Sequence, residues 1–194
     1  MVIRRLIEEV GAATGIVYGR NGKSVLREKV EAYNKAACRF PWVVLVDLDQ
    51  DYSCAPSLQS SWVPNPARWM CFRIAVRKVE SWLIADTERI ARFLHVPLSR
   101  VPRDPEALDD PKRTMVELAQ NSRRSDIKKD MVPRIGSERS IGPAYASRLI
   151  EFVSDSEVGW RPSVAAQCSD SLRRSLDCLR RLIRQFPWSG NVVQ

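Results

Sequence analysis

The sequence lacks any long hydrophobic run. Its longest uninterrupted apolar stretch, residues 42–46, is far shorter than the roughly 20 residues that a membrane-spanning helix needs. The first residues also lack the apolar segment and the small-residue cleavage site of a signal peptide. We therefore expect no membrane segment and a cytoplasmic location.

Histidine is nearly absent, and cysteines are few. The one histidine, His95, follows a predicted helix, where capping is a commoner role than catalysis, so we do not expect histidine-based chemistry. The five cysteines include no C-x-x-C pair, which argues against a zinc ribbon, and their odd number argues against a disulfide framework. Cys71 and Cys178 fall in apolar patterns and are predicted to be buried thiols.

Basic residues are abundant. Lysine and arginine number 31 against 23 acidic residues, so the formal net charge is +8, while 44% of the residues are hydrophobic. That hydrophobic content supports a folded core, and the positive charge favours non-specific attraction to nucleic acid. The 194 residues suit one domain with a helical extension.

Strand and helix patterns alternate in the first half and then give way to helices. Helices are expected at 2–11, 24–38 and 79–94, strands at 14–18, 42–46 and 69–76, a tight turn at 19–22 and a long loop at 48–68. This order predicts an α/β core over residues 1–96, with a mainly parallel sheet flanked by helices. Residues 97–194 are predicted to be a helical extension packed on that core, with helices at 111–121, 125–131, 143–154 and 169–186.

Acidic residues follow the most hydrophobic strand. Asp47 and Asp49 alternate with Leu48, so an extended backbone places both carboxylates on one side at the carboxyl end of the strand, where α/β sheets bind ligands. Paired carboxylates suit Mg²⁺ or Mn²⁺, and magnesium is usually completed by water and phosphate. The alternative is an acidic turn whose side chains bond to loop amides.

A second group of charged residues follows the next predicted strand. Glu80 is placed to approach the same edge of the sheet, and Arg77 and Lys78 beside it are candidate phosphate contacts. The alternative is that Glu80 only favours a helix N-terminus through the helix dipole.

These segments together resemble an uncharacterised bacterial TOPRIM-like family that is related to the catalytic domains of OLD-type nucleases. The resemblance rests on residues 22–24, 41–49 and 74–86, and extends to 110–112, 132–134 and 142–145. It implies a TOPRIM-like fold and Mg²⁺- or Mn²⁺-dependent phosphodiester chemistry. Asp47 and Asp49 match the family's D-x-D motif, and Glu80 matches an acidic position in the W-L-x-A-D segment, so the resemblance implies that these three residues bind the metal.

One part of the family pattern is missing. The family carries a further glutamate on a strand before the first helix, and here Met1 begins almost inside that helix. We therefore expect an exposed sheet edge that a neighbouring segment, a second copy or a partner chain covers.

The C-terminal half adds a basic loop. Residues 123–148 hold seven basic and three acidic side chains, and Gly136 and Gly142 flank a flexible stretch. Backbone amides beside arginines can cradle phosphate, so Arg134 and Arg139 of this loop are candidate substrate contacts. With the residues near the sheet, the full set of candidate substrate contacts is Arg77, Lys78, Lys23, Arg134 and Arg139.

Three hypotheses follow from the sequence. The first is a nuclease-like enzyme that uses Mg²⁺ or Mn²⁺ at Asp47, Asp49 and Glu80 to act on nucleic acid. The second is a non-catalytic subunit that binds nucleic acid or protein on a degenerate TOPRIM scaffold. The third is a small-molecule phosphotransferase or hydrolase, because a metal ion held by the same carboxylates would serve that chemistry as well.

Overall fold

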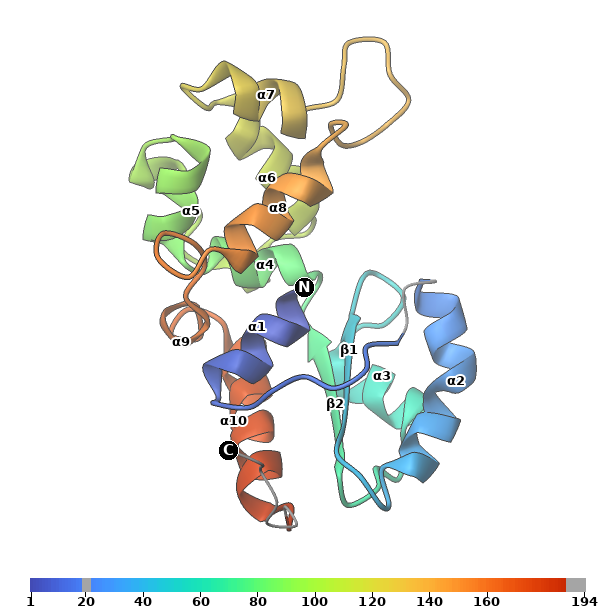
Figure 1. The fold of residues 1–194 in the computed structure, drawn as a ribbon. Coiled ribbons are helices and arrows are strands. Elements are labelled where there is room, and N and C mark those ends of the chain that lie inside the picture. The colour runs from blue at the N-terminus through green and yellow to red at the C-terminus, as the bar shows by residue number, and fades with distance from the viewer. Residues whose placement is uncertain (19–21, 188–194) are drawn as a thin grey trace.

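The chain folds as an α/β protein in which helices surround a small parallel sheet (Figure 1). The structure, a computed structural model, describes residues 1–18 and 22–187. Two strands, β1 (Trp42–Asp47) and β2 (Met70–Ala75), form the sheet. The helices of the first half are α1 (Val2–Glu9), α2 (Lys23–Ala36), α3 (Ala55–Trp62), α4 (Val79–Ile84) and α5 (Thr87–Leu94). Those of the second half are α6 (Pro111–Gln120), α7 (Ser125–Met131), α8 (Tyr145–Ser154), α9 (Pro162–Ala165) and α10 (Asp170–Gln185), with short 3-10 helices at Leu98–Arg100 and Pro105–Ala107.

The two strands run parallel, as the sequence predicted. They pair in register from Trp42 opposite Met70 to Asp47 opposite Ala75, and α3 lies in the crossover between them. Within the described residues the sheet has two strands only, so the predicted parallel sheet is present but small. Both carboxyl ends reach the same edge, which is where the predicted site residues begin.

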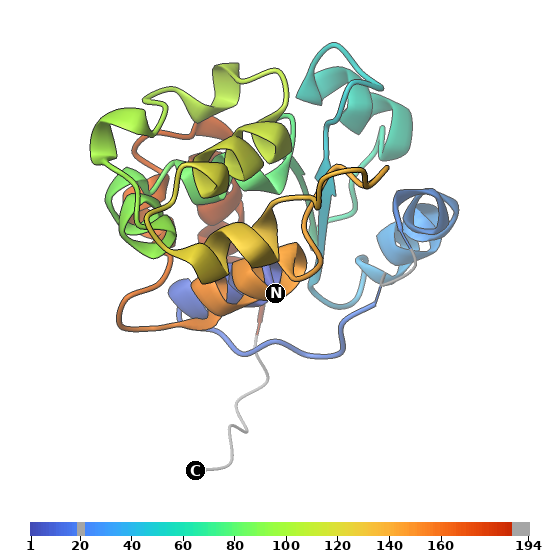
Figure 2. The same ribbon diagram turned by 90° about the horizontal axis from the view of Figure 1, so that it is seen from above.

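Alternate residues of the strands enter two separate hydrophobic clusters. Even-numbered residues such as Val46, Phe72 and Ile74 face α2 and α3 and form the smaller cluster. Odd-numbered residues such as Cys71 and Ala75 enter the larger cluster, which joins α1 to most of the later helices. Figure 2 shows these two groups of helices on opposite sides of the sheet. The larger cluster contains residues from both sides of the predicted boundary at residue 96.

Helix α10 crosses the odd-numbered face of β2 in the antiparallel direction. The Phe186 ring meets Trp69 edge-on at 5.1 Å, and Ser175 Oγ accepts a hydrogen bond from Arg73 Nε at 3.4 Å. At the other end of the strand, Ser171 Oγ accepts from the Val76 amide at 3.3 Å. Residue numbers along the strand rise while those of their partners on the helix fall, so these three contacts define the antiparallel alignment of β2 with α10.

Two predicted segments differ in the structure. Residues 14–18 form no strand, because no neighbouring strand pairs with their backbone; the segment is anchored instead by the Tyr18 ring, which stacks on Trp42 at 5.6 Å. The predicted loop at 48–68 contains α3, which has a proline in its first turn and buries Leu58 and Trp62 four residues apart. Residues 19–21 of the predicted turn lie outside the described residues. No helix in the described ranges is long and apolar enough to cross a bilayer.

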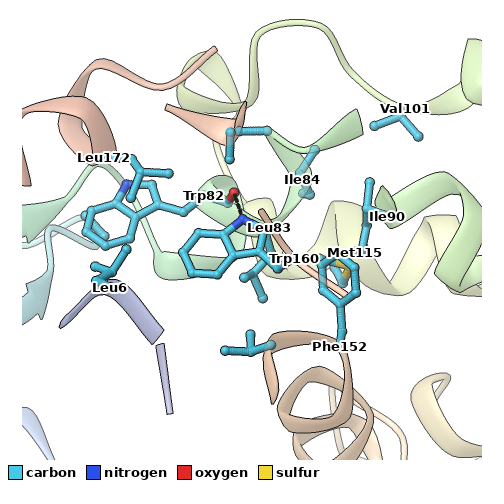
Figure 3. Packing of buried hydrophobic residues seen from close by; sticks show 14 of the residues in the cluster. Leu6, Trp82, Leu83, Ile84, Ile90, Val101, Met115, Phe152, Trp160 and Leu172 are labelled. Carbon is cyan, nitrogen blue, oxygen red and sulfur yellow. Dashed lines mark hydrogen bonds between the residues drawn. The ribbon is translucent and has the colours of Figure 1, made fainter. Parts of the chain in front are cut away.

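Two buried tryptophans join the larger cluster. Trp160 is fully buried and donates its indole N–H to the carbonyl oxygen of Trp82 at 3.0 Å, a bond drawn dashed in Figure 3. Trp160→Phe keeps an aromatic ring but leaves that buried carbonyl without its donor. We expect a loss of about 1–2 kcal/mol in the free energy of unfolding, measured by urea denaturation. An unchanged unfolding free energy would contradict the assigned role of this bond.

Candidate functional site

The backbone turns sharply at the carboxyl edge of the sheet. After β1, the Leu48 amide donates to the Ala75 carbonyl at 2.9 Å, and the Asp49 amide donates to the Arg77 carbonyl at 2.8 Å. Asp49 and Arg77 both adopt positive φ angles, 52° and 60°, which non-glycine residues rarely do. The Arg77 guanidinium returns to the Asp49 carbonyl oxygen at 3.4 Å. These bonds hold the two loops together, and such strained residues concentrate at functional sites.

Asp47 is partly buried at the end of β1 and points at the start of α4. Its Oδ1 accepts a hydrogen bond from the Val79 amide at 2.9 Å. Burial, followed by the negative charge of Glu80, raises the pKa of Asp47 from its ordinary value to about 6, although the Val79 amide acts in the opposite direction. Asp47 therefore lies near enough to Glu80 for the two negative charges to repel.

Glu80 lies in the first turn of α4 and is only 6% exposed. Its Oε1 accepts a hydrogen bond from the Tyr145 hydroxyl at 3.2 Å and lies 3.8 Å from the Lys112 ammonium. Burial and the charge of Glu80 raise the pKa of Tyr145. Sequence reasoning did not select Lys112 or Tyr145 as site residues, although both lie in segments that carry the family resemblance.

Asp49 faces a different partner. The Lys23 ammonium, at the start of α2, lies 2.8 Å from Asp49 and 3.0 Å from Asp51. Burial lowers the pKa of Lys23, but the hydrogen bonds to these two carboxylates outweigh it and raise the pKa. The D-x-D carboxylates are therefore held differently: Asp47 lies beside Glu80, and Asp49 is neutralised by a lysine.

Lys78 completes the cationic surroundings of the acids. It occupies the N-cap position of α4, and its ammonium lies 3.3 Å from Asp110, the residue that caps α6. Burial raises the pKa of Asp110, but the Arg113 amide and Lys78 outweigh it and lower the pKa. Of the predicted residues, the structure gathers Lys23, Asp47, Asp49, Arg77, Lys78 and Glu80 at this edge.

The three predicted acids do not form one ligand cluster. Among residues 1–18 and 22–187, no three His, Cys, Asp or Glu side chains are arranged to hold a metal ion. The chain matches no protein-family model, no curated protein and no solved structure.

Arg134 and Arg139 lie apart from these contacts. Both are exposed on the loop between α7 and α8, and their side chains make no hydrogen bond or ion pair with the described part of the chain. Figures 1 and 2 show this loop projecting at the end of the molecule toward which the strands point. The loop shares that end with the acids, but the structure gives it no contact with them.

A cleft adjoins the carboxyl edge of the sheet. It has a volume of about 760 Å³ and opens between α3 and α10, and we call it the arginine cleft. Its basic lining residues are Arg73, Arg77, Arg174 and Arg181. Arg174 is paired with Asp170, whereas the other three form no ion pair within the described ranges. Arg77 lines this cleft and also contacts Asp49, so the cleft and the acidic edge are continuous.

Proposed function

We propose that this chain uses Mg²⁺ or Mn²⁺ at Asp47 and Glu80 to hydrolyse phosphodiester bonds in nucleic acid, on a TOPRIM-like scaffold. One observation carries the proposal: the mutually repelling carboxylates of Asp47 and Glu80 lie at the carboxyl edge of parallel strands, with lysine side chains beside them. A cation between such carboxylates relieves their repulsion. That edge is also where ligands bind in open α/β sheets.

The donor set fits a magnesium-like ion. Mg²⁺ is commonly held by one or two carboxylates and completes its shell with water and substrate phosphate, so Asp47 and Glu80 supply a sufficient protein contribution. Asp49 is available as a third ligand if Lys23 releases it. Bound there, the ion would polarise a phosphate and lower the pKa of a bound water.

The surrounding cations suit a phosphate substrate. Lys112 already lies 3.8 Å from Glu80, and Lys78 and Arg77 flank the start of α4, so phosphate oxygens at this edge would meet positive charge. Arg134 and Arg139 project from the same end and are suited to a longer polyanion. The match of residues 110–112 and 142–145 to the family resemblance supports the proposal, because Lys112 and Tyr145 both contact Glu80.

A non-catalytic subunit that binds nucleic acid or protein is the second candidate. The observation that favours it is the pairing of Asp49 with Lys23, since a lysine ammonium in place of a metal ion already neutralises one carboxylate of the D-x-D motif. In that case the basic groups would bind phosphates without cleavage. The two candidates differ in whether a divalent ion binds.

Metal binding decides between them. We expect Mn²⁺ to give saturable binding in isothermal titration calorimetry of the full chain. Asp47→Asn combined with Glu80→Gln should weaken that binding at least about tenfold, because both carboxylate ligands become neutral amides. Cleavage of single-stranded and duplex DNA in Mn²⁺ would then be measured for the same two proteins.

The matched control is Glu157→Gln, which removes one exposed carboxylate from the loop between α8 and α9. This variant should bind Mn²⁺ as the parent does. Binding that survives the double substitution would disprove the assigned ligands, and a parent chain that binds nucleic acid but no Mn²⁺ would establish the non-catalytic alternative.

A further inference from the structure

Two cysteines that the proposed function does not use face each other in the larger cluster. Cys71 lies on β2 on the same face as Trp69 and Arg73, and Cys178 lies on α10 one turn after Ser175. The antiparallel contacts described above place Trp69 against Phe186, Arg73 against Ser175 and Val76 against Ser171. Cys71 therefore falls opposite Cys178, and the two thiols lie close enough for each to shift the pKa of the other.

The two thiols differ in what surrounds them. Cys71 is fully buried, whereas Cys178 is 9% exposed and forms part of the wall of the arginine cleft. The Arg181 guanidinium lies 3.9 Å from Cys178 Sγ, and Arg73 is held over the same face of α10. A sulfur at Cys178 is thus open to a small molecule in the cleft, and Cys71 lies behind it.

The charges favour a thiolate at Cys178. The neighbouring Cys71 thiol and the nearby guanidinium groups of Arg73 and Arg181 lower the pKa of Cys178, against the effect of burial. The neighbouring Cys178 sulfur and burial raise the pKa of Cys71. The accessible sulfur is therefore the nucleophilic one, since the thiolate is the reactive form of cysteine.

We propose that Cys178 and Cys71 form a peroxide-reactive thiol pair that closes a disulfide between α10 and β2. The Cys178 thiolate attacks the terminal oxygen of a hydroperoxide, the O–O bond breaks, and the alcohol or water leaves with a proton. Cys178 becomes a sulfenic acid, oxidised by two electrons, and the peroxide is reduced. The Cys71 sulfur then attacks this sulfenic sulfur, an S–S bond forms, the S–O bond breaks, and the hydroxyl group leaves with the Cys71 proton as water.

The chain allows a direct test, because trypsin separates all five cysteines. Cleavage after arginine places Cys71 in peptide 69–73 and Cys178 in peptide 175–180. The reduced full chain is treated with stoichiometric hydrogen peroxide, remaining thiols are alkylated, and the digest is analysed by mass spectrometry. We expect peptides 69–73 and 175–180 joined by a disulfide that dithiothreitol reverses. No variant is needed for this measurement.

A second measurement tests the role of the guanidinium. Arg181→Gln should slow iodoacetamide alkylation of Cys178 near neutral pH by about three- to tenfold, because the thiolate loses an adjacent positive charge. Arg180→Gln is the matched control, because it removes one positive charge from the residue that precedes Arg181. Arg180 pairs with Asp177 rather than with Cys178. Alkylation of this control should match that of the parent chain.

Three results would overturn the proposal. One is oxidation of Cys178 to a sulfinic acid with peptide 69–73 left as a free thiol. Another is a disulfide from Cys178 to Cys54, which also lines the cleft, in peptide 40–68. The third is faster oxidation of exposed Cys168 than of Cys178. Each would show that the pairing of β2 with α10 does not direct the chemistry.

Discussion

Asp86→Ala should destabilise the protein by about 3 kcal/mol, measured as the free energy of unfolding in urea. The Asp86 carboxylate is fully buried and accepts hydrogen bonds from the Arg161 amide at 2.9 Å and from the Arg161 guanidinium at 3.0 and 2.6 Å. Removal of one partner of a buried ion pair typically costs about 3–5 kcal/mol. We take the lower end, because the Arg161 side chain is 33% exposed and water can solvate it.

Glu88→Ala is the control for this prediction. Glu88 lies 3.1 Å from the same guanidinium, but its side chain is 68% exposed. Exposed ion pairs contribute little, so we expect a loss below about 1 kcal/mol. Equal losses for the two variants would show that burial of Asp86 does not set its contribution. Asp86 belongs to the segment that carries the family resemblance. Comparison of the two variants therefore also tests whether the role of Asp86 is to stabilise the fold.

Asp47→Asn should stabilise the metal-free protein by about 2 kcal/mol at pH 8. The pKa of Asp47 rises from an ordinary 3.8 to about 6 on folding, so the folded state holds the proton more tightly than the unfolded state does. Each unit of pKa shift corresponds to about 1.4 kcal/mol, which sets an upper limit of about 3 kcal/mol. Asparagine keeps an oxygen for the Val79 amide and removes the charge that burial and Glu80 disfavour.

The pH dependence has a definite sign. The favourable contribution of protonated Asp47 is fully present below about pH 4 and is lost as the pH rises through about 6. The advantage of Asp47→Asn should therefore be large at pH 8 and vanish near pH 4, as followed by thermal unfolding in a chelator. Asp49→Asn should show no such gain, because it loses the Lys23 ion pair. A variant at Asp47 no more stable than the parent at pH 8 would contradict the assigned environment.

Much of the fold follows from patterns within single segments. The β1 strand was predictable because a short uninterrupted apolar run is typical of a buried strand, and α10 was predictable because burial on one face imposes a period of about 3.6 on a helix. The helix α3 was missed because serine, proline and glutamine conceal a pattern of only two buried residues, Leu58 and Trp62. The strand predicted at 14–18 was wrong because β-branched composition does not supply a pairing partner.

The candidate site was predictable only in part. Asp47 ends β1, Asp49 follows it, and Glu80 comes shortly after β2, so the topology of a parallel sheet brings them to one edge. Lys112 and Tyr145 reach Glu80 from helices α6 and α8, and no spacing in the sequence reports contacts between residues 32 and 65 positions apart. The pairing of Asp49 with Lys23 was also not predictable, because it depends on where the start of α2 lies relative to the turn after β1.

The contacts between β2 and α10 have a consequence for how the chain matures. They join residues that are 95 and 102 positions apart in the sequence, and contacts of such long range form late in folding. During synthesis the strand emerges long before the helix that covers its odd-numbered face. The nascent chain therefore carries an uncovered apolar surface until α10 leaves the ribosome, and a premature stop before residue 170 would leave that surface open to aggregation or to capture by a chaperone.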